Sequence, residues 1–180
     1  ARWDHSVPLE GKRVGIVGTG STACQIVGAI TDRVAEMHVF QRTPHWVAPL
    51  PQKEYSARWN QFLTVFPFMQ RLVYHYYFQI LVRTFSAATV GNKLMQRWMT
   101  QICRKNLEDN VPNPVLRARL TPDYQVTCKR LIFCSDYYPA LCRPNAYLIT
   151  EGIARVEPQG IRTTGGKLHE LDVLVLATGF

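Results

Sequence analysis

The chain has 180 residues, of which 47% are hydrophobic; this fits one globular domain, or one domain and a small second piece. Its 21 Lys and Arg outnumber its 13 Asp and Glu, and the net charge of +8 suits an anionic ligand or a nucleic acid. The five cysteines are odd in number and form no C-x-x-C pair, which argues against a zinc site or a disulfide framework and favours reduced thiols in the cytoplasm.

The strongest motif is a nucleotide-binding fingerprint near the start of the chain. Residues 13–17 are dominated by Val and Ile, the composition of a strand buried on both faces. The next six residues fit G-x-G-x-x-A, and the apolar spacing after them predicts a helix that reaches about residues 31–34. The fingerprint consists of Gly18, Thr19, Gly20, Ser21, Thr22 and Ala23.

Each small residue of this fingerprint has a physical role. Gly18 permits the tight turn out of the strand, and Gly20 lets a pyrophosphate approach the backbone because it has no Cβ. Ala23 is small enough for the helix to pack on the sheet. Ser21 and Thr22 stand where free N–H groups and the helix dipole favour an anion. We therefore predict a bound dinucleotide; the alternative is a glycine turn in an unrelated α/β domain.

The end of the second predicted strand, residues 37–41, indicates which dinucleotide is bound. An NAD site needs Asp or Glu about 20 residues after the glycines, to accept a hydrogen bond from the ribose 2′-hydroxyl. Here Gln41 is neutral, Arg42 is cationic and Thr43 follows. A guanidinium binds a 2′-phosphate through paired charge-assisted hydrogen bonds, so the sequence favours NADP(H). The alternative is that Arg42 is a solvated charge at the strand end.

An insertion over about residues 52–113 is too long for an ordinary loop and has helical spacing. We expect Pro67 to kink or divide its first helix, and a further helix to cover residues 91–105. The simplest interpretation of its many aromatic side chains is a local helical core. A lid over a substrate and a membrane-surface patch are the alternatives. Polar residues interrupt its most apolar part, residues 62–82, so we expect no spanning helix.

The rest of the chain predicts strands of two kinds. Alternation with a period of two from residue 153 to residue 170 indicates a small antiparallel meander. Apolar runs over residues 131–134 and 172–179 indicate buried strands, the second of them parallel and ending in a small-residue turn, Ala177-Thr178-Gly179. A further strand is predicted over residues 147–150. We therefore predict an α/β fold, a Rossmann-like doubly wound parallel sheet with a β-meander and a helical insertion.

Several segments together resemble the NADP-binding domain of a class B flavoprotein monooxygenase, most of all a Baeyer–Villiger monooxygenase. The fingerprint resembles the second dinucleotide motif of that family, and residues 39–44 resemble its 2′-phosphate strand. Cys128-Lys129-Arg130, with Asp136-Tyr137-Tyr138 after it, resembles the segment that carries the active-site arginine. Residues 176–180 resemble the A-T-G strand that returns to the flavin domain. Trp3-Asp4 resembles the end of the F-x-G-x-x-x-H-x-x-x-W-[PD] signature, whose first residues would precede residue 1.

This resemblance implies a reaction for the intact protein. NADPH reduces FAD, O₂ adds at the flavin C4a position to give a peroxide, and the peroxide inserts oxygen next to a ketone carbonyl, forming an ester or lactone. Arg130 would be the catalytic residue, because arginine is a permanent cation that does not give up its proton to the peroxide. Lys129 would contact the cofactor phosphate beside Arg42. The terminal turn, Ala177, Thr178 and Gly179, would also lie at the cofactor.

The first G-x-G-x-x-G of the family, which binds FAD, is not in this chain, and both ends look cut. We therefore interpret residues 1–180 as an NADP-binding domain from a longer flavoprotein, with at most NADP(H) binding of its own. FAD would be bound mainly by the absent domain of the same polypeptide. The small-molecule substrates would be a ketone and O₂.

Other functions remain open at this point. A monooxygenase that oxygenates nitrogen or sulfur would share most of these motifs and would not need Arg130. A non-catalytic NADP-binding module is a further alternative. The basic residues are spread along the chain and match no nucleic-acid-reading motif, so we expect no nucleic-acid partner. We also predict no metal site and no membrane association.

Overall fold

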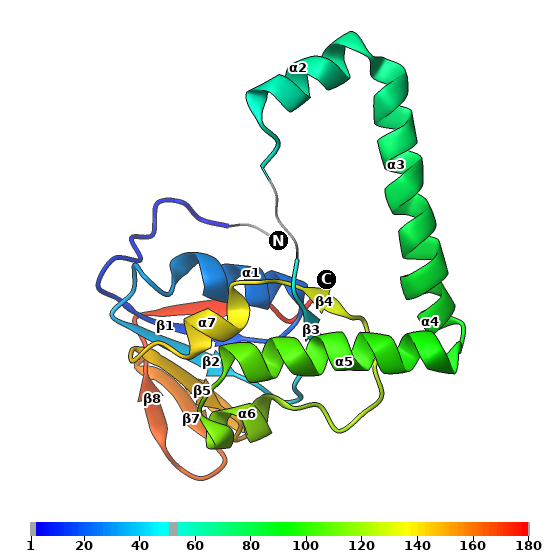
Figure 1. Ribbon diagram of the computed structural model, residues 1–180. Helices are drawn as coiled ribbons and strands as arrows, with labels where there is room; N and C mark the ends of the chain where they lie inside the picture. Colours follow the sequence, from blue (N-terminus) through cyan, green and yellow to red (C-terminus); the bar gives the residue numbers. More distant parts are fainter. Residues whose placement is uncertain (1–2, 51–53, 180) are drawn as a thin grey trace.

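The computed structural model describes residues 3–50 and 54–179, which form an α/β fold around a parallel sheet (Figure 1). The sheet has four strands in the order β5-β2-β1-β9, and every neighbouring pair is parallel. The strands are β1 (Arg13–Val17), β2 (Glu36–Phe40), β5 (Ala146–Ile149) and β9 (Val173–Leu176). The chain adds β2 and β5 on one side of β1 and β9 on the other, as in a Rossmann-like sheet.

Position in the sheet explains the apolar runs of the sequence. Val14, Ile16 and Val39 lie in the two central strands and are fully buried. The last strand is parallel, as predicted, but it lies at the edge of the sheet. The expectation that it is buried is therefore wrong, because an edge strand has one neighbour only: its residues are half-exposed and Leu176 is 69% exposed.

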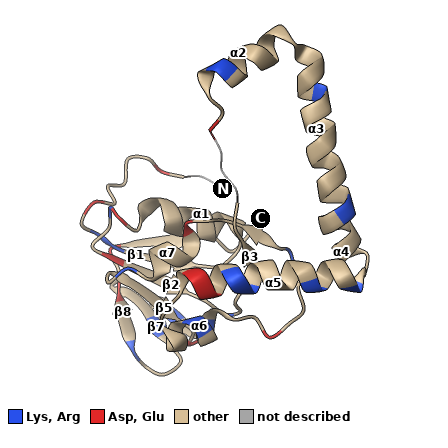
Figure 2. Ribbon diagram, viewed as in Figure 1, with Lys and Arg blue, Asp and Glu red and all other residues tan. Residues whose placement is uncertain are grey.

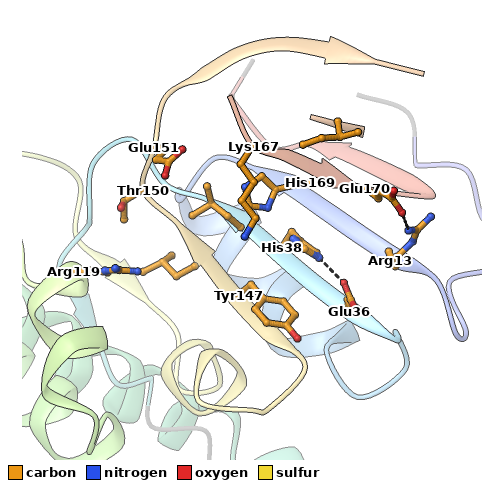
Figure 3. A pocket seen from close by; sticks show the side chains of 13 residues that line it. Arg13, Glu36, His38, Arg119, Tyr147, Thr150, Glu151, Lys167, His169 and Glu170 are labelled. Atoms are coloured by element: carbon orange, nitrogen blue, oxygen red, sulfur yellow. Dashed lines mark hydrogen bonds and ion pairs between the residues drawn. The ribbon is translucent and has the colours of Figure 1, made fainter. Parts of the chain in front are cut away.

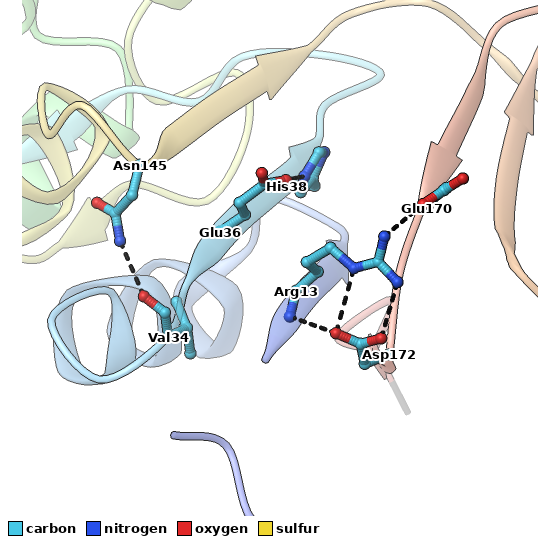
Figure 4. Close-up of polar contacts among 7 residues, drawn as sticks. All are labelled: Arg13, Val34, Glu36, His38, Asn145, Glu170 and Asp172. Carbon is cyan, nitrogen blue, oxygen red and sulfur yellow. Dashed lines mark hydrogen bonds and ion pairs between the residues drawn. The ribbon is translucent and has the colours of Figure 1, made fainter. Parts of the chain in front are cut away.

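Polar side chains join the amino ends of the strands (Figure 4). The Arg13 Nη2 atom donates to Asp172 Oδ1 at 2.9 Å, and the Arg13 backbone N–H donates to the same carboxylate at 2.8 Å. Asn145, just before β5, donates to the carbonyl oxygens of Thr31 and Val34 at 3.0 and 3.1 Å. These bonds attach β9 to β1, and the loop that enters β2 to the start of β5.

The main core lies between one face of the sheet and a layer of helices (Figure 1). The helices are α1 (Ser21–Ile30), α5 (Lys93–Asn110), α6 (Pro114–Leu120) and α7 (Tyr137–Leu141). Tyr137 and Tyr138, to which the sequence assigned no role, are buried in this core. Their burial raises the pKa of both hydroxyls above the ordinary range, so both stay neutral.

The predicted meander is confirmed and covers the other face of the sheet. It consists of β6 (Ile153–Glu157), β7 (Gly160–Thr163) and β8 (Leu168–Glu170), which pair antiparallel in that order. Ile161 of β7 is fully buried and packs in a small cluster with Phe40 and Ile149 of the parallel sheet. The sheet therefore has helices on one face and the meander on the other.

The run at residues 131–134 does not form a strand of the main sheet, which corrects the sequence-based expectation. It contributes only β4 (Ile132–Phe133), which pairs in parallel with β3 (Val47–Ala48) in a separate two-stranded sheet. The run is apolar because it contributes to two cores: Ile132 and Cys134 are buried in the main core. Leu131 is buried in a second small core, with Trp46 and with Met99 and Cys103 of α5.

The insertion divides into helices, and Pro67 separates the first two as predicted. They are α2 (Ala57–Val65), α3 (Pro67–Leu81), the π-helical turn η1 (Val82–Ser86) and α4 (Ala87–Thr89). The expected local helical core is wrong: no residue of α2, α3 or η1 is buried, because these helices run end to end and stand away from the body (Figure 1). Within the described parts of the chain, no helix is long and apolar enough to cross a membrane.

Candidate nucleotide-binding site

Three turns meet at the carboxyl edge of the parallel sheet. The last residue of β1, Val17, stands opposite Phe40 of β2 and Leu176 of β9. The segments that follow these residues carry most of the predicted cofactor-binding positions. They are Gly18, Thr19, Gly20, Ser21, Thr22 and Ala23; Gln41, Arg42 and Thr43; and Ala177, Thr178 and Gly179.

Gly18 lies where the first and third turns touch. Its φ is +116°, and a Cβ on it would stand 2.4 Å from the carbonyl oxygen of Ala177. The Gly18 N–H donates to the Phe40 carbonyl at 3.3 Å, and the Ala177 N–H donates to the Val17 carbonyl at 2.9 Å. A glycine is thus required here by the close approach of the two turns as well as by the backbone conformation.

Gly20 faces open space, since a Cβ built on it would have no neighbour within 4 Å. It is the N-cap of α1 and provides no side-chain cap, and the first turn of the helix contains no acidic residue. The free N–H groups and the dipole of this helix are therefore available to an anion. Ala23 is fully buried where α1 packs on the sheet, which fits the role that its small size suggests.

The loop after β2 is attached to the fingerprint. The Thr19 hydroxyl donates to the Thr43 carbonyl at 3.0 Å. Gln41 is only 3% exposed, and its Nε2 donates to the Arg119 carbonyl at 2.8 Å, so this side chain holds the end of α6. Arg42 is exposed, and within the described residues its guanidinium has no ion pair. An incoming phosphate would meet no competing carboxylate on it.

Lys129 lies beside the continuation of the same loop. Its Nζ stands 4.4 Å from the centroid of the Tyr124 ring. The Tyr124 hydroxyl donates to the Pro44 carbonyl at 3.1 Å and lies 3.3 Å from Nδ1 of His45. The pKa of His45 is lowered by partial burial and, second, by the positive charge of Lys129. A second cation is therefore close to the residues that follow Arg42.

The pairing of β3 with β4 determines where Arg130 lies. The Ile132 N–H donates to the Trp46 carbonyl at 3.1 Å, and Ile132 stands opposite Val47. Continuing this register backward puts Arg130 level with His45. Its side chain is exposed, like that of Lys129. The segment with Lys129 and Arg130 thus lies next to the continuation of the loop that carries Arg42, although the two are far apart in the sequence.

A cavity of about 520 Å³ lies elsewhere, beside the meander (Figure 3). Its lining includes His38, Tyr147, Lys167 and His169. Glu36 also lines it, and its Oε2 atom lies 2.8 Å from Nε2 of His38. None of the predicted cofactor-binding residues lines it. The hollow at the meander is therefore separate from the candidate nucleotide-binding site.

No known family model matches the chain. The chain is 43% identical to an uncharacterized monooxygenase of Mycobacterium tuberculosis over 180 residues; this alignment covers 100% of this chain and 36% of that protein. It is 38% identical to a Baeyer–Villiger monooxygenase of Pseudomonas aeruginosa over 182 residues; this alignment covers 99% of this chain and 34% of that protein. The chain thus spans about a third of the length of these relatives.

Solved structures match nearly the same extent of the chain. One is cyclohexanone monooxygenase from Rhodococcus sp. Phi1 bound to NADP⁺, with a TM-score of 0.83, 25% identity, and coverage of 99% of this chain and 40% of that one. Another is OTEMO in complex with FAD and NADP, with a TM-score of 0.76, 26% identity, and coverage of 98% and 39%. The resemblance to Baeyer–Villiger monooxygenases that the motifs indicate is confirmed, and it extends over almost the whole chain.

The sequence did not indicate the contacts that gather the cations. Tyr124 and His45 connect the Lys129 segment to the loop after β2, yet neither belongs to a motif that the sequence shows. β3 and β4 have two residues each, which is too short for any periodicity. Only their pairing, a long-range contact, could have shown that these segments are neighbours.

Proposed function

We propose that this chain is the NADPH-binding part of an FAD-dependent Baeyer–Villiger monooxygenase, which inserts oxygen next to a ketone carbonyl to give an ester or lactone. One observation carries the proposal: the fingerprint turn and the cationic loop after β2 meet at the carboxyl edge of the parallel sheet, and Lys129 lies beside the continuation of that loop. The five free cysteines fit a cytoplasmic protein.

The residues at this edge fit NADP(H). The open space over Gly20 and the uncapped start of α1 would receive the pyrophosphate. Arg42 would bind the 2′-phosphate of the adenosine ribose, with Lys129 as a second cation beside it. Gln41 would contribute through its backbone, because its side chain is bonded to the Arg119 carbonyl. Bound NADPH would supply a hydride to FAD, and FAD would supply the chemistry that activates O₂.

Arg130 would provide a fixed positive charge close to the reacting oxygen. A guanidinium has a pKa above about 12, so it stays charged and does not donate its proton to the oxygen nucleophile. In a site that excludes water, such a charge stabilises negative charge that develops on oxygen by several kcal/mol. The exposed position of Arg130 beside the loop after β2 leaves it available to face the FAD-binding part.

The test is an Arg130→Ala exchange in the full-length enzyme, with flavin reduction and ester formation measured separately. We expect NADPH to reduce the flavin at close to the normal rate, and ester formation from a ketone to fall by about 10² or more. Lys12→Ala is the control: it also removes an exposed cation, but at the opposite end of β1. Both reactions should survive in the control.

Three results would contradict the proposal. Normal ester production by Arg130→Ala would remove this residue from the mechanism. A protein that oxidises a sulfide or an amine but never a ketone would belong to the nitrogen- and sulfur-oxygenating class, whose reaction has no need for Arg130. If the full-length protein binds no flavin, the chain would instead be a non-catalytic NADP-binding module.

A further inference from the structure

The two outer helices of the insertion present an apolar surface that this chain leaves uncovered. No residue of α2 or α3 is buried. Most of their aromatic and aliphatic side chains are exposed, by 36% at Trp59 to 71% at Tyr74, and the others are half-buried. In Figure 1 both helices stand clear of the body, attached through the segment before α2 and through η1 and α4. A contiguous apolar surface of this kind marks a contact with something else.

The apolar side chains of α3 cover most of the circumference of the helix. Tyr74 and Phe78 stack on each other with their centroids 6.1 Å apart, and they are 71% and 46% exposed. Leu72 and Tyr76 occupy another side at helical spacing and are 57% and 63% exposed. The polar residues of the helix include a narrow stripe at helical spacing, Arg71, His75 and Gln79. Apolar residues on most sides are typical of a helix that protein largely encloses, whereas a helix on a membrane surface has a broad, strongly charged face.

Between Glu54 and Glu108 the charge of the insertion has one sign. From Tyr55 to Leu107 the sequence has no Asp or Glu but seven Lys or Arg. Figure 2 shows blue segments along α2, α3 and α5, and red only at the far end of α5. Of the seven cations, only Lys105 has an ion-pair partner within the described residues, Asp109. A surface rich in aromatic side chains and Arg has the composition of a protein–protein interface.

The comparisons indicate what covers this surface. The match to cyclohexanone monooxygenase takes in 99% of this chain, so it includes α2 and α3, and it uses only 40% of the longer chain. These helices therefore have counterparts in a protein whose remaining part is larger than this chain. A region of that size in the same polypeptide is present at a high effective concentration and is the nearest available partner.

We infer that α2 and α3 are the contact surface for the FAD-binding part of the same polypeptide, which encloses α3 on more than one side and presents acidic side chains to it. This inference rests on the proposed function, because that function supplies the partner. Tyr74 and Tyr76 lie on different sides of α3 and become buried together. Arg58 and Arg71 find carboxylates on the opposing surface.

The test is thiol labelling of the full-length enzyme. Tyr74→Cys and Tyr76→Cys variants are treated with a maleimide, and the labelled peptides are quantified by mass spectrometry in the native and the urea-unfolded protein. We expect both positions to be labelled at least about tenfold more slowly in the native state than in urea. Val156→Cys on β6, where the side chain is 61% exposed, is the matched control and should show little protection. Amide hydrogen exchange of α3 in the unsubstituted enzyme provides the same readout without a substitution.

Other coverings give different results. Fast labelling of either position in the native enzyme would overturn the inference. Protection that grows with protein concentration would assign the surface to a second copy, and protection that needs phosphatidylserine vesicles would assign it to a membrane; both overturn it. Adding Arg71→Glu to the Tyr74→Cys variant should speed its labelling severalfold, and adding Arg71→Lys should not. Equal labelling rates in these two double variants would overturn the inference that acidic side chains face Arg71. Flavin content and NADPH oxidation, measured on the same samples, report separately on the proposed function.

Discussion

At the scale of single residues, Gly18 and Gly20 belong to one motif but are glycines for different reasons. Gly18 has a positive φ and touches the Ala177 carbonyl, so its requirement is internal to the protein. Gly20 has φ −76° and nothing nearby, so the protein alone would accept a side chain there. The open space at Gly20 is what a ligand that approaches the backbone would need.

Alanine at these two positions separates stability from binding. Gly18→Ala should lower the free energy of unfolding by about 1–3 kcal/mol or more, because the backbone conformation and the contact with Ala177 are both unfavourable for a Cβ. Gly20→Ala should leave the free energy of unfolding within about 0.5 kcal/mol but weaken NADP⁺ binding. Urea unfolding and titration calorimetry measure the two effects. Unchanged NADP⁺ affinity in Gly20→Ala would argue against a pyrophosphate at this turn.

Arg42 should determine the preference for NADPH over NADH. A charge-assisted contact to the 2′-phosphate contributes about 1.5–3 kcal/mol, which is roughly a tenfold to hundredfold difference in affinity. Arg42→Ala should remove most of this difference and leave NADH binding nearly unchanged, since NADH has no 2′-phosphate. Calorimetric titration of the full-length enzyme with both cofactors checks this. Tighter binding of NADH by the unsubstituted protein would contradict the assignment.

At the scale of elements, α5 attaches the insertion to the body through a buried polar contact. Asn106 is 8% exposed and donates from Nδ2 to the Val47 carbonyl at 3.0 Å. Asn106→Leu leaves that carbonyl without this donor and should lower the free energy of unfolding by about 1–3 kcal/mol. The control is Lys105→Ala, which removes only a surface ion pair worth about 0–1 kcal/mol. Urea unfolding measures both variants. If they lose similar free energy of unfolding, the buried hydrogen bond of Asn106 contributes no more than a surface ion pair.

Elements with a strong local pattern could be predicted from the sequence, and those fixed by distant contacts could not. β1 needs only its Val and Ile run, and Pro67 divides two helices wherever the chain goes. α5 continues to Asn110, beyond the predicted residue 105, because its last turns pack on the body through Asn106 and Leu107. α6 was not predicted: it has only seven residues, although Asn113 as N-cap and Pro114 as its first residue are signals for the start of a helix.

The same division applies to the candidate site. The fingerprint and the Arg42 loop are local motifs whose chemistry is visible in the residue order. The proximity of Lys129 to that loop depends on Tyr124, a contact over 80 positions to Pro44. The aromatic insertion shows the limit most clearly, because spacing indicates a helix but does not say what covers it. A helix that packs on its own domain has the same sequence pattern as a helix that packs on another domain.

At the scale of the whole molecule, the charge of +8 is divided between two surfaces. One is the loop after β2 with the segment beside it, where Arg42, Lys129 and Arg130 are exposed. The other is the part of the insertion from Tyr55 to Leu107, with seven cations and no acid. Many of the carboxylates are paired elsewhere, near the amino edge of the sheet and in the meander. The net charge therefore indicates an anionic ligand and an acidic protein surface, and does not require nucleic acid.

The paired carboxylates determine how the fold responds to acid. Hydrogen bonds from Arg13 lower the pKa of Asp172 to about 2, and those from Arg162 and Arg155 lower the pKa of Glu157 to about 2. In the unfolded chain these groups titrate near 4, so each carboxylate stabilises the fold above about pH 4 and this contribution is lost as the pH falls from about 4 to about 2.

Neutral amides in place of these carboxylates should flatten that acid dependence. Asp172→Asn and Glu157→Gln should each reduce the drop in unfolding free energy between about pH 5 and pH 2, because a neutral amide has no proton to gain and the ion pair that it replaces is already absent at pH 7. Both variants should be less stable than the unsubstituted protein at pH 7 and should approach it in acid. Glu54→Gln is the control, since Glu54 is exposed and makes no ion pair with the described residues. Urea unfolding of the full-length protein at several pH values measures the curves, and parallel curves for all four proteins would show that these ion pairs do not control acid unfolding.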